Sequence, residues 1–555
     1  MVGDDTLGQQ KPRTYIKKVS RNKNCVTIKG ILFGITNKAV YERLNFLLIN
    51  RDTKREIESK CNVTKLNNGS ILFEAELNLD SHVFVYRNRE EILDAFLIAN
   101  QSKIKIRIGN PSFWVKNRIK DFVFKNSKTD MCSLTPYYTF KENNLSFKLN
   151  VFNNENYYYM KKVMFFSLFF RLIYKRKNIW LLGELDYRAQ DNAMMLYNYL
   201  RENYRAENVY YVIDRESNDR RNLKDQTNVI HFGSKKHILY TIVANKILTT
   251  HHPDYIYPTS MNKFKKKVKG KKLFLTHGIF GVKNMYKNYG NYMNGFKVDH
   301  IITSSEQERQ AVINQLKYNK AQVSVTGIPR LDKLFVPDVS AENAILVIPT
   351  WRDWLITKEP FEESEYYHRY LSLIQSNFLR ELCERYNVKL TFCIHPNFRM
   401  YTKYFSSSFA EIMFQGEVNI QDLIKSHKLM VTDYSSVGFD FSLLNKPVIF
   451  YGFDIERFTN NEKSHIKIPE ALPGDFIKDD KQLFQMIEYY VKSNFSQKKE
   501  HRLRAEELIK YRDLNACNRV YQVAKTIKKS SKRKSDNFIW KTIITSVNKL
   551  LNITP

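Results

Sequence analysis

At 555 residues, with 43% hydrophobic and 14% aromatic residues, the chain is long enough for two to four globular domains with sizeable cores. Its formal charge of +32 predicts a polyanionic partner or surface: nucleic acid, anionic lipid or a phosphate-rich substrate. The 6 cysteines form no C-x-x-C pair, which argues against a zinc cluster or a disulfide framework and favours a reducing cytoplasm. The first residues lack the apolar core of a secretory signal, and no apolar run reaches the roughly 18–20 residues that span a bilayer, so we expect a protein that is not integral to a membrane.

Residues 1–155 are predicted to form a small β-rich domain. Short alternating or apolar runs recur there, such as CVTIKGILFG, SILFEAELNL and LSFKLNVF, and they are broken by Asn, Asp and Lys. Nothing in these runs indicates catalysis. Structural packing is the simpler interpretation, and an accessory role in acceptor binding is the alternative.

Residues 156–177 are predicted to form a basic amphipathic connecting helix. Its sequence, within YYYMKKVMFFSLFFRLIYKRK, places apolar residues between lysines and arginines and is too short to span a membrane. Such a helix can lie in the plane of anionic head groups, or it can be a buried bridge between two domains. Residues 526–555 form a second basic amphipathic segment, which fits either an anionic membrane or a solvated tail.

From residue 178 the pattern changes to alternating strands and helices. Residues 178–338 and 339–525 each contain several strand-like apolar runs followed by helical segments, which predicts two Rossmann-like units. Ser305 and Glu308 form a capping-box pattern that places the start of one helix. The predicted fold class is therefore α/β, with two Rossmann-like domains facing a cleft at the carboxyl ends of both sheets.

The segment VTDYSSVGFDFSLLNKPVIFY, which runs from Val431 to Tyr451, predicts a strand, a short helix and another strand. Ser435 or Ser436 could cap the helix, where unpaired N–H groups and the positive end of the helix dipole would suit a phosphate. The alternative is a serine-capped helix that binds nothing.

His277 follows the strand-like run LFLT and precedes Gly278, whose missing side chain would let a substrate approach the backbone. An imidazole in this place could remove a proton from an attacking hydroxyl. Lys283 could add a positive charge to the same site. The alternatives are a histidine satisfied by the backbone at a strand end and a solvated lysine.

Thr350 and Arg352 lie in IPTWRDW, after the first strand of the second unit, where an arginine could hold two phosphate oxygens. His395 ends the strand LTFCI and is followed by a proline that fixes the turn. Its imidazole could hydrogen-bond a diphosphate and stabilise charge on a leaving phosphate.

Asp433 and Asp440 flank the serine pair, the first at a strand end and the second on the helix. Carboxylates would repel a phosphate, so they fit hydroxyls of a polyol or ribose, or they are acidic residues favoured at a helix start. The chain has no G-x-x-x-x-G-K-[ST] loop, no G-x-G-x-x-G after a strand and no Asp-x-Asp motif. These absences argue against a nucleotide triphosphatase, a dehydrogenase and a metal-dependent sugar transferase, so we expect neither a metal nor a cofactor.

Five ordered motifs between about residues 180 and 525 carry a resemblance to a known family: HGIFGVKN, TGIPRLDKL, IPTWRD, IHPN and VTDYSSVGFDFSLLNKPVIFY. Together they resemble the CDP-glycerol glycerophosphotransferases, the family of teichoic acid polymerases and primases. The resemblance implies a GT-B-like fold, with residues 178–338 on the acceptor side and 339–525 on the CDP-donor side. It also implies a peripheral enzyme on the cytoplasmic face of the plasma membrane, which transfers glycerol phosphate from CDP-glycerol to an undecaprenyl-linked acceptor and releases CMP.

The resemblance also implies roles for single residues. It makes His277 the base on the acceptor hydroxyl and makes His395 a ligand of the donor pyrophosphate. It further implies Arg352, Ser435 and Ser436 at the pyrophosphate and Asp440 at the donor hydroxyls. From the residues themselves we also expect Thr350 at the donor polyol or nucleotide, with Gly278, Lys283 and Asp433 as supporting residues. Glu184 and Asn192, in LLGELDYRAQDNAMMLYNYL, receive no role.

Several other functions remain open at this point. Transfer of ribitol phosphate from CDP-ribitol would use the same pyrophosphate site, and a GT-B hexosyltransferase is a more distant rival. A nucleic-acid-binding protein or a membrane scaffold would explain the charge but not His277 and His395 at paired strand ends, so no nucleic-acid partner is expected. A homo-oligomer is compatible with the sequence.

Overall fold

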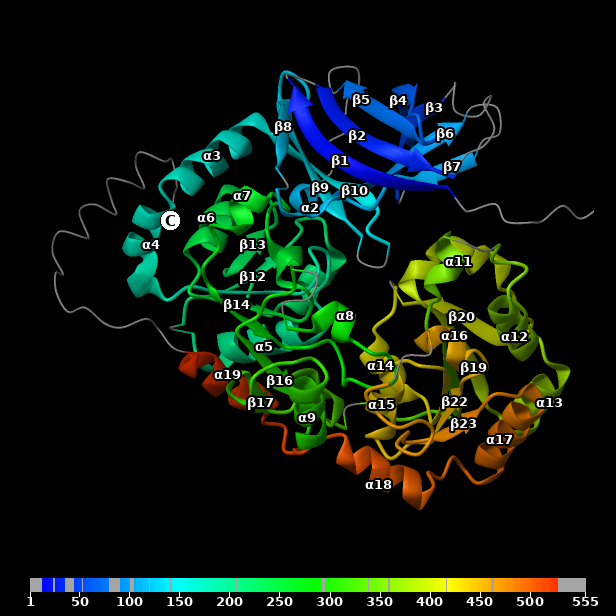
Figure 1. Cartoon of the computed structure of the whole chain (residues 1–555). Helices are drawn as coiled ribbons and strands as arrows, with labels where there is room; N and C mark the ends of the chain where they lie inside the picture. The colour runs from blue at the N-terminus through cyan, green and yellow to red at the C-terminus, as the bar shows by residue number, and fades with distance from the viewer. Residues whose placement is uncertain are drawn as a thin grey trace, which may run out of the picture.

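Three β-sheets organise the chain. The computed structural model describes residues 12–22, 25–34, 44–51, 53–78, 90–99, 104–118, 120–139, 142–205, 207–291, 295–337, 339–357, 360–415, 417–460 and 464–527. Figure 1 shows an antiparallel sheet in blue above a first parallel unit in green, with a second parallel unit in yellow and orange beside the first. This architecture confirms the predicted fold class, a GT-B-like pair of α/β units preceded by a β-rich domain.

The N-terminal sheet is antiparallel throughout, in the order β1-β2-β5-β4-β3-β6-β10-β9-β8, with β7 paired to β6. Its elements are β1 (Arg13–Asn22), β2 (Cys25–Phe33), β3 (Leu44–Asn50), β4 (Glu56–Lys65), β5 (Ile71–Asn78), β6 (Glu91–Ala99), β7 (Ile104–Arg107), α2 (Phe113–Asn117), β8 (Phe122–Lys125), β9 (Asp130–Tyr138) and β10 (Leu145–Asn153). Alternate residues of β5 point into its core, as the period of two requires. The sheet is joined to the first parallel unit by Asn150, whose Oδ1 accepts hydrogen bonds from Ser260 N at 3.0 Å and Ser260 Oγ at 2.7 Å.

The connecting segment forms two helices rather than the single predicted helix. α3 (Asn154–Phe165) and α4 (Ser167–Tyr174) are separated at Phe166, whose ψ of 19° departs from helical geometry, and a 3₁₀ turn, η1 (Lys175–Lys177), follows. One face of α4 packs on the first parallel unit and the other is solvent-exposed. Within the described ranges, no helix is long and apolar enough to cross a bilayer.

The first parallel unit has the strand order β13-β12-β11-β14-β15-β16-β17. Its elements are β11 (Trp180–Gly183), α5 (Asn192–Asn203), β12 (Val209–Ile213), η2 (Asn218–Asn222), β13 (Val229–His231), α6 (Lys235–Val243), β14 (Lys246–Thr249), η3 (Pro253–Ile256), α7 (Asn262–Lys265), β15 (Lys271–Phe274), α8 (Tyr286–Tyr289), β16 (His300–Thr303), α9 (Glu306–Asn314), η5 (Lys320–Gln322), β17 (Val323–Val325) and α10 (Arg330–Leu334). β11, β14 and the residues of β12 are almost wholly buried, as expected for a parallel sheet covered on both faces.

The second parallel unit has the strand order β20-β19-β18-β21-β22-β23. Its elements are β18 (Ala344–Ile348), α11 (Asp353–Thr357), α12 (Glu365–Ile374), α13 (Asn377–Tyr386), β19 (Lys389–Ile394), η6 (Pro396–Tyr404), β20 (Ala410–Phe414), α14 (Ile420–Ser426), β21 (Leu429–Thr432), α15 (Val437–Ser442), β22 (Val448–Tyr451), α16 (Ile455–Thr459), β23 (Asp475–Ile477), α17 (Asp480–Lys492), α18 (Lys499–Glu507) and α19 (Ala516–Thr526). In both parallel units the strand order reverses beside the first strand, at β11 and at β18, which is where ligands bind in open α/β sheets.

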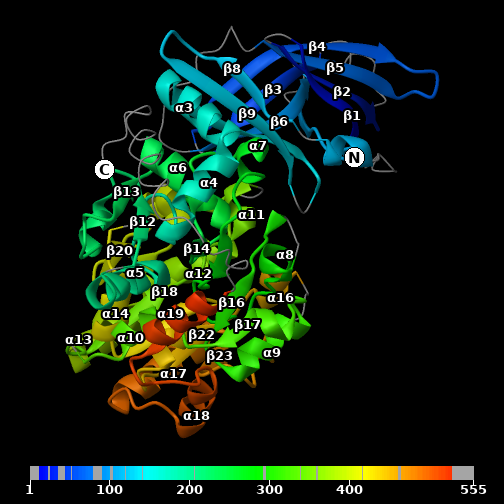
Figure 2. The ribbon, with the colours of Figure 1, turned by 90° about the vertical axis from the view of Figure 1, so that its left-hand side faces the viewer.

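The last helix returns to the first unit. Figures 1 and 2 show α18 and α19 in orange and red running back from the second unit, and α19 lies against α5. The Asp332 carboxylate accepts hydrogen bonds from the N–H groups of Ala516 and Cys517 at 2.9 and 2.8 Å. The rings of Tyr521 and Trp180 pack with a centroid distance of 5.9 Å. The sequence placed this helix with the second unit because its chain position follows that unit. Residues 528–555 of the predicted basic tail lie outside the described residues.

Candidate active site

Three neighbouring strands of the first unit end at one edge of the sheet. β11 pairs in parallel with β14, and β14 pairs in parallel with β15, so the loops that follow these strands share that edge. Those loops contain Glu184 to Asp191 after β11, His251 after β14 and His277 after β15. The predicted placement of His277 at a strand end is what the structure shows.

The loop before His277 is strained and held in place by Asn192. Thr276 has a φ of 52°, which a β-branched residue rarely adopts and which costs about 1–3 kcal/mol. The buried Asn192 side chain donates to the carbonyls of Leu275 and Thr276 at 3.2 and 2.9 Å, and its oxygen accepts the N–H of Arg330 at 2.9 Å. Asn192, to which the sequence assigned no role, therefore fixes the direction in which the chain enters His277.

His277 lies among aromatic rings. The His251 ring stacks on it with a centroid distance of 5.4 Å and an interplanar angle of 15°, and the Tyr289 hydroxyl lies 3.4 Å from Nδ1. Burial, assisted by the charge of Arg330, lowers the pKa of His277, while Asp191 acts in the opposite direction. The imidazole is therefore neutral at pH 7, the form that accepts a proton.

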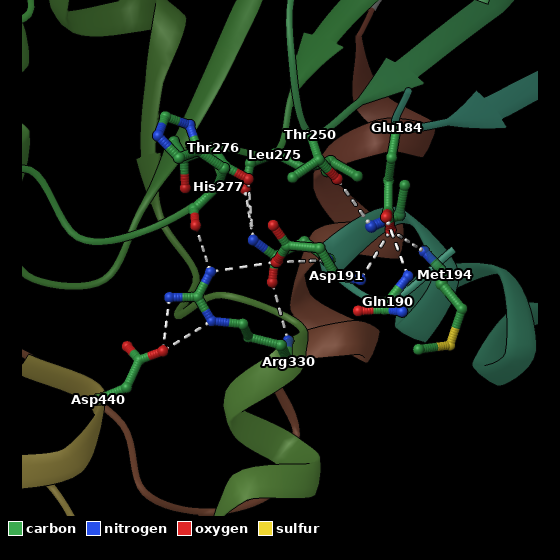
Figure 3. Close-up of polar contacts among 12 residues, drawn as sticks. Glu184, Gln190, Asp191, Met194, Thr250, Leu275, Thr276, His277, Arg330 and Asp440 are labelled. Atoms are coloured by element: carbon green, nitrogen blue, oxygen red, sulfur yellow. Dashed lines mark hydrogen bonds and ion pairs between the residues drawn. The ribbon is translucent and has the colours of Figure 1, made fainter. Parts of the chain in front are cut away.

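Arg330 connects the two parallel units. Its Nε and Nη2 contact Asp440 Oδ2 at 2.9 and 2.6 Å, and its Nη1 contacts Asp191 Oδ1 at 3.1 Å and the carbonyl of His277 at 2.5 Å (Figure 3). Arg330 lies in the motif TGIPRLDKL, but no role was predicted for it from the sequence. Asp440, which the sequence placed at the donor polyol, is buried, and one of its two oxygens forms an ion pair with Arg330.

Glu184 fixes the loop after β11. Its buried carboxylate accepts the N–H groups of Gln190 at 3.0 Å, Asp191 at 2.9 Å and Met194 at 3.1 Å, which satisfies donors at the start of α5 (Figure 3). This gives Glu184 a structural role that the sequence did not identify. An acidic residue directly after a buried strand was the signal for it.

Glycines bring the His277 loop directly against the second unit. A Cβ added to Gly278 would lie 2.6 Å from Ser436 Oγ, and one added to Gly281 would lie 2.0 Å from the Phe439 ring. Real Cβ atoms do not approach other atoms this closely. The glycine that was predicted to admit a substrate therefore has the second unit as its close neighbour in the structure.

The rest of this loop is held by Glu308. Its carboxylate accepts the N–H of Phe280 at 2.9 Å and that of Ser304 at 2.6 Å. Ser305 Oγ accepts the N–H of Glu308 at 3.2 Å, so the predicted cap at the start of α9 is present. The Glu308 side chain serves the His277 loop instead of closing the capping box.

The serine pair begins a helix of one and a half turns. Ser435 Oγ accepts the N–H of Val437 at 3.3 Å, whereas Ser436 has helical angles and its side chain caps no N–H of the described α15. Ser435 is thus the capping residue of the two. Ser436 lies at the interface between the units, where Gly278 approaches it.

Arg352 differs from the prediction. Its guanidinium is fully buried, with Nη1 2.8 Å from Asp433 Oδ2 and with Nε and Nη2 2.7 and 2.9 Å from the two oxygens of Asp454. Nη1 also donates to the carbonyl of Thr350 at 2.6 Å. An arginine neutralised by two carboxylates in a dry environment holds the strand ends together and does not present charge to a pyrophosphate.

Asp433 and Thr350 belong to the same network. Asp433 is buried, and its two oxygens accept the N–H of Thr350 at 2.9 and 3.0 Å, joining the ends of β21 and β18. The supporting role of Asp433 at a donor site stays a prediction. The Thr350 hydroxyl is buried and has no hydrogen-bond partner among the described residues.

His395 is a neutral hydrogen-bond donor. Its Nδ1 accepts the N–H of Asn397 at 3.1 Å, so in the neutral imidazole the proton lies on Nε2. Burial, with a further contribution from the positive charge of Arg188, lowers the pKa of His395 to about 3. Lys283 lies elsewhere at the interface, with Nζ 5.8 Å from the centroid of the Phe458 ring.

Comparison with known proteins agrees with the motifs. Residues 164–525 match the family model described as CDP-Glycerol:Poly(glycerophosphate) glycerophosphotransferase, and residues 10–149 match the TarS beta-glycosyltransferase C-terminal domain 1. The chain is 28% identical over 370 residues to the minor teichoic acid biosynthesis protein GgaB of Bacillus subtilis (strain 168), a match that covers 63% of this chain and only 40% of GgaB. It is 24% identical over 361 residues to the teichoic acid glycerol-phosphate transferase of Staphylococcus aureus (strain NCTC 8325 / PS 47), covering 59% of this chain and 89% of that protein.

Among solved structures, the wall teichoic acid polymerase TagF aligns with a TM-score of 0.48 and 14% identity, covering 67% of this chain and 96% of TagF. The family model, by contrast, spans well over half of the chain and includes both parallel units with the strand-end residues described above. The chain belongs to the CDP-glycerol:poly(glycerophosphate) glycerophosphotransferase family.

Proposed function

We propose that the chain transfers glycerol phosphate from CDP-glycerol to the terminal hydroxyl of an undecaprenyl-linked acceptor or growing poly(glycerol phosphate) chain in teichoic acid biosynthesis. Family membership supports the reaction class. The observation that carries the assignment to this site is the neutral His277, which follows a strained residue and lies in a loop packed against the second unit.

In this proposal, His277 takes the proton of the acceptor hydroxyl while that oxygen bonds to the β-phosphorus of the donor. The bond between this phosphorus and the bridging oxygen breaks, and CMP leaves with the electron pair. A fixed loop suits this role, because a general base must lie within hydrogen-bond reach of the proton it removes.

His395 would donate a hydrogen bond from Nε2 to the donor diphosphate, since its Nδ1 accepts a backbone N–H. The serine hydroxyls at the start of α15 and the unpartnered Thr350 hydroxyl would add neutral donors on the same side. Protein side chains would thus position the diphosphate in line with the acceptor, and turnover should persist in EDTA.

Peripheral membrane attachment on the cytoplasmic face is part of the proposal. On α3 and α4, Phe165, Leu168 and Leu172 are 80%, 72% and 60% exposed, and η1 adds three exposed basic residues. An exposed apolar face next to cations is the combination that binds the interface of an anionic bilayer. This face would bring the enzyme to a lipid-linked acceptor.

The reaction is tested by incubating the full chain with radiolabelled CDP-glycerol, CDP-ribitol or a UDP-sugar and a lipid-linked acceptor analogue. We expect CMP release and labelled product with CDP-glycerol. Preference for CDP-ribitol would reassign the donor, and turnover of only the UDP-sugar would contradict a polyol-phosphate transferase.

Attachment is tested by sedimentation with phosphatidylglycerol vesicles. Substituting serine for Phe165, Leu168 and Leu172 together should move the protein to the supernatant, whereas Leu503→Ser, on the exposed face of α18, should not. Equal sedimentation of the triple variant would contradict the proposed surface.

A further inference from the structure

The proposed donor carries a diphosphate, and neither of the two residues described above as its predicted ligands, Arg352 and His395, supplies positive charge to it. Arg352 is buried between Asp433 and Asp454, and His395 is neutral. Charge on a diphosphate is recognised most strongly by an ionised donor, above all by an arginine that can bind two oxygens. A cation from another element is therefore expected at the edge where the strands end.

Arg188 occupies that edge. It lies in the loop after β11, the strand next to β14, while β14 and β15 are followed by His251 and His277. Burial lowers the pKa of His251 in the first unit and of His395 in the second, and the positive charge of Arg188 lowers both further. The guanidinium is therefore within electrostatic reach of histidines from both units.

The loop that carries Arg188 is rigid on the backbone side. The N–H of Arg188 donates to the carbonyl of Leu185 at 3.0 Å, and the carbonyl of Arg188 accepts a hydrogen bond from the Tyr211 hydroxyl at 2.9 Å. The next residue donates to Asp219 at 3.0 Å, and Glu184 binds the two N–H groups that follow. A fixed backbone reduces the entropy lost when the side chain engages a ligand.

The Arg188 guanidinium is not neutralised. No ion pair joins it to any residue in the described part of the chain, and its one ring contact is with its neighbour Tyr187, at 5.8 Å. By contrast, Arg330 and Arg352 each contact two carboxylates. A half-buried arginine left unpaired at a strand edge is available to an anion.

We propose that Arg188 binds the diphosphate of the donor and is the residue that supplies its countercharge. This inference rests on the proposed function and adds to it a cation from the first unit, so that the donor diphosphate is held from both units. Closure of the two units on the nucleotide would follow from that shared contact.

The test compares Arg188→Gln and Arg188→Lys with Arg205→Gln, a matched loss of charge at an exposed position in the turn after α5, at the opposite edge of the sheet. Calorimetry with CDP and with cytidine reports binding, and steady-state kinetics report KM and kcat for CDP-glycerol. Thermal melting reports folding.

We expect Arg188→Gln to weaken CDP binding and raise KM at least tenfold, with Arg188→Lys intermediate, because losing a hydrogen bond from a charged group typically costs at least this much. Cytidine binding by Arg188→Gln should stay within about twofold of the parent value. CDP binding and KM of Arg205→Gln should do the same.

Unchanged CDP binding in Arg188→Gln, or an equal loss for cytidine, would overturn the inference. Arg188-dependent CDP binding without turnover of any CDP-polyol would uphold it while refuting the proposed function. A parent chain that binds neither CDP nor CDP-glycerol would refute both.

Discussion

Arg330 and Asp440 join the two parallel units through a buried ion pair in which Nε and Nη2 both contact Oδ2, at 2.9 and 2.6 Å. The same guanidinium holds the carbonyl of His277 through Nη1. One side chain therefore contacts both the second unit and the backbone of His277. This arrangement couples closure of the two units to the geometry of the proposed base.

Removing either partner of this pair should be strongly destabilising. Asp440→Asn and Arg330→Gln each leave a buried partner uncompensated, which typically costs about 3–5 kcal/mol. We expect a lower free energy of unfolding in urea and a lower kcat, because the His277 carbonyl loses its support. The control is Asp513→Asn, which breaks an ion pair between the half-exposed Asp513 and Arg519. It should lower the free energy of unfolding by only about 0–1 kcal/mol. If Asp440→Asn lowered the free energy of unfolding by as little as the control does, the Arg330–Asp440 pair would be dispensable.

Both strand-end histidines should be needed for turnover. His277→Ala and His395→Ala should fold normally and lose at least about a hundredfold in rate, the scale for removing a general base or a stabilising donor. His368→Ala, on the exposed face of α12, should retain the parent rate. Single-turnover assays with radiolabelled donor measure the chemical step, and near-normal turnover of either variant would remove that residue from the mechanism.

The pH dependence should report the lowered pKa of His277. The base is active when neutral, so kcat/KM should rise with pH through a pKa below the ordinary value of about 6.5 and stay level above it. The direction follows because burial disfavours the imidazolium form. The profile of His277→Gln should lack this acidic limb. A limb that persists unchanged in that variant would assign the titration to another group.

The sequence predicted the architecture because its signals are local. Buried parallel strands give continuous apolar runs, and the two series of such runs identified both units and their strand ends. His277 and His395 were placed at strand ends for the same reason, since each directly follows such a run. The motif order then led to the family, which the match to residues 164–525 confirmed.

What the sequence could not give is which polar side chains neutralise one another. Arg352 and Arg330 both lie in quoted motifs, but only the fold shows that the first is enclosed by Asp433 and Asp454 and that the second reaches Asp440. The paired residues are separated by 81 to 110 positions along the chain. Pairings of this range follow from sheet order, which local patterns do not encode.

The glycine-lined contact between the units predicts a specific double-variant result. In Gly281→Ala, the added Cβ would meet the Phe439 ring at 2.0 Å, and Phe439 is itself packed in the core shared by both units. Overpacking of this kind costs about 1–3 kcal/mol, and here it is relieved most easily by moving the units apart. We therefore expect a lower kcat/KM and a larger radius of gyration in solution scattering, with the separate cores intact. Phe439→Leu, which removes ring atoms from the contact, should restore part of the activity when combined with Gly281→Ala, and on its own it serves as the control. If the double variant is no more active than Gly281→Ala, the steric explanation fails and the loop itself has been disturbed.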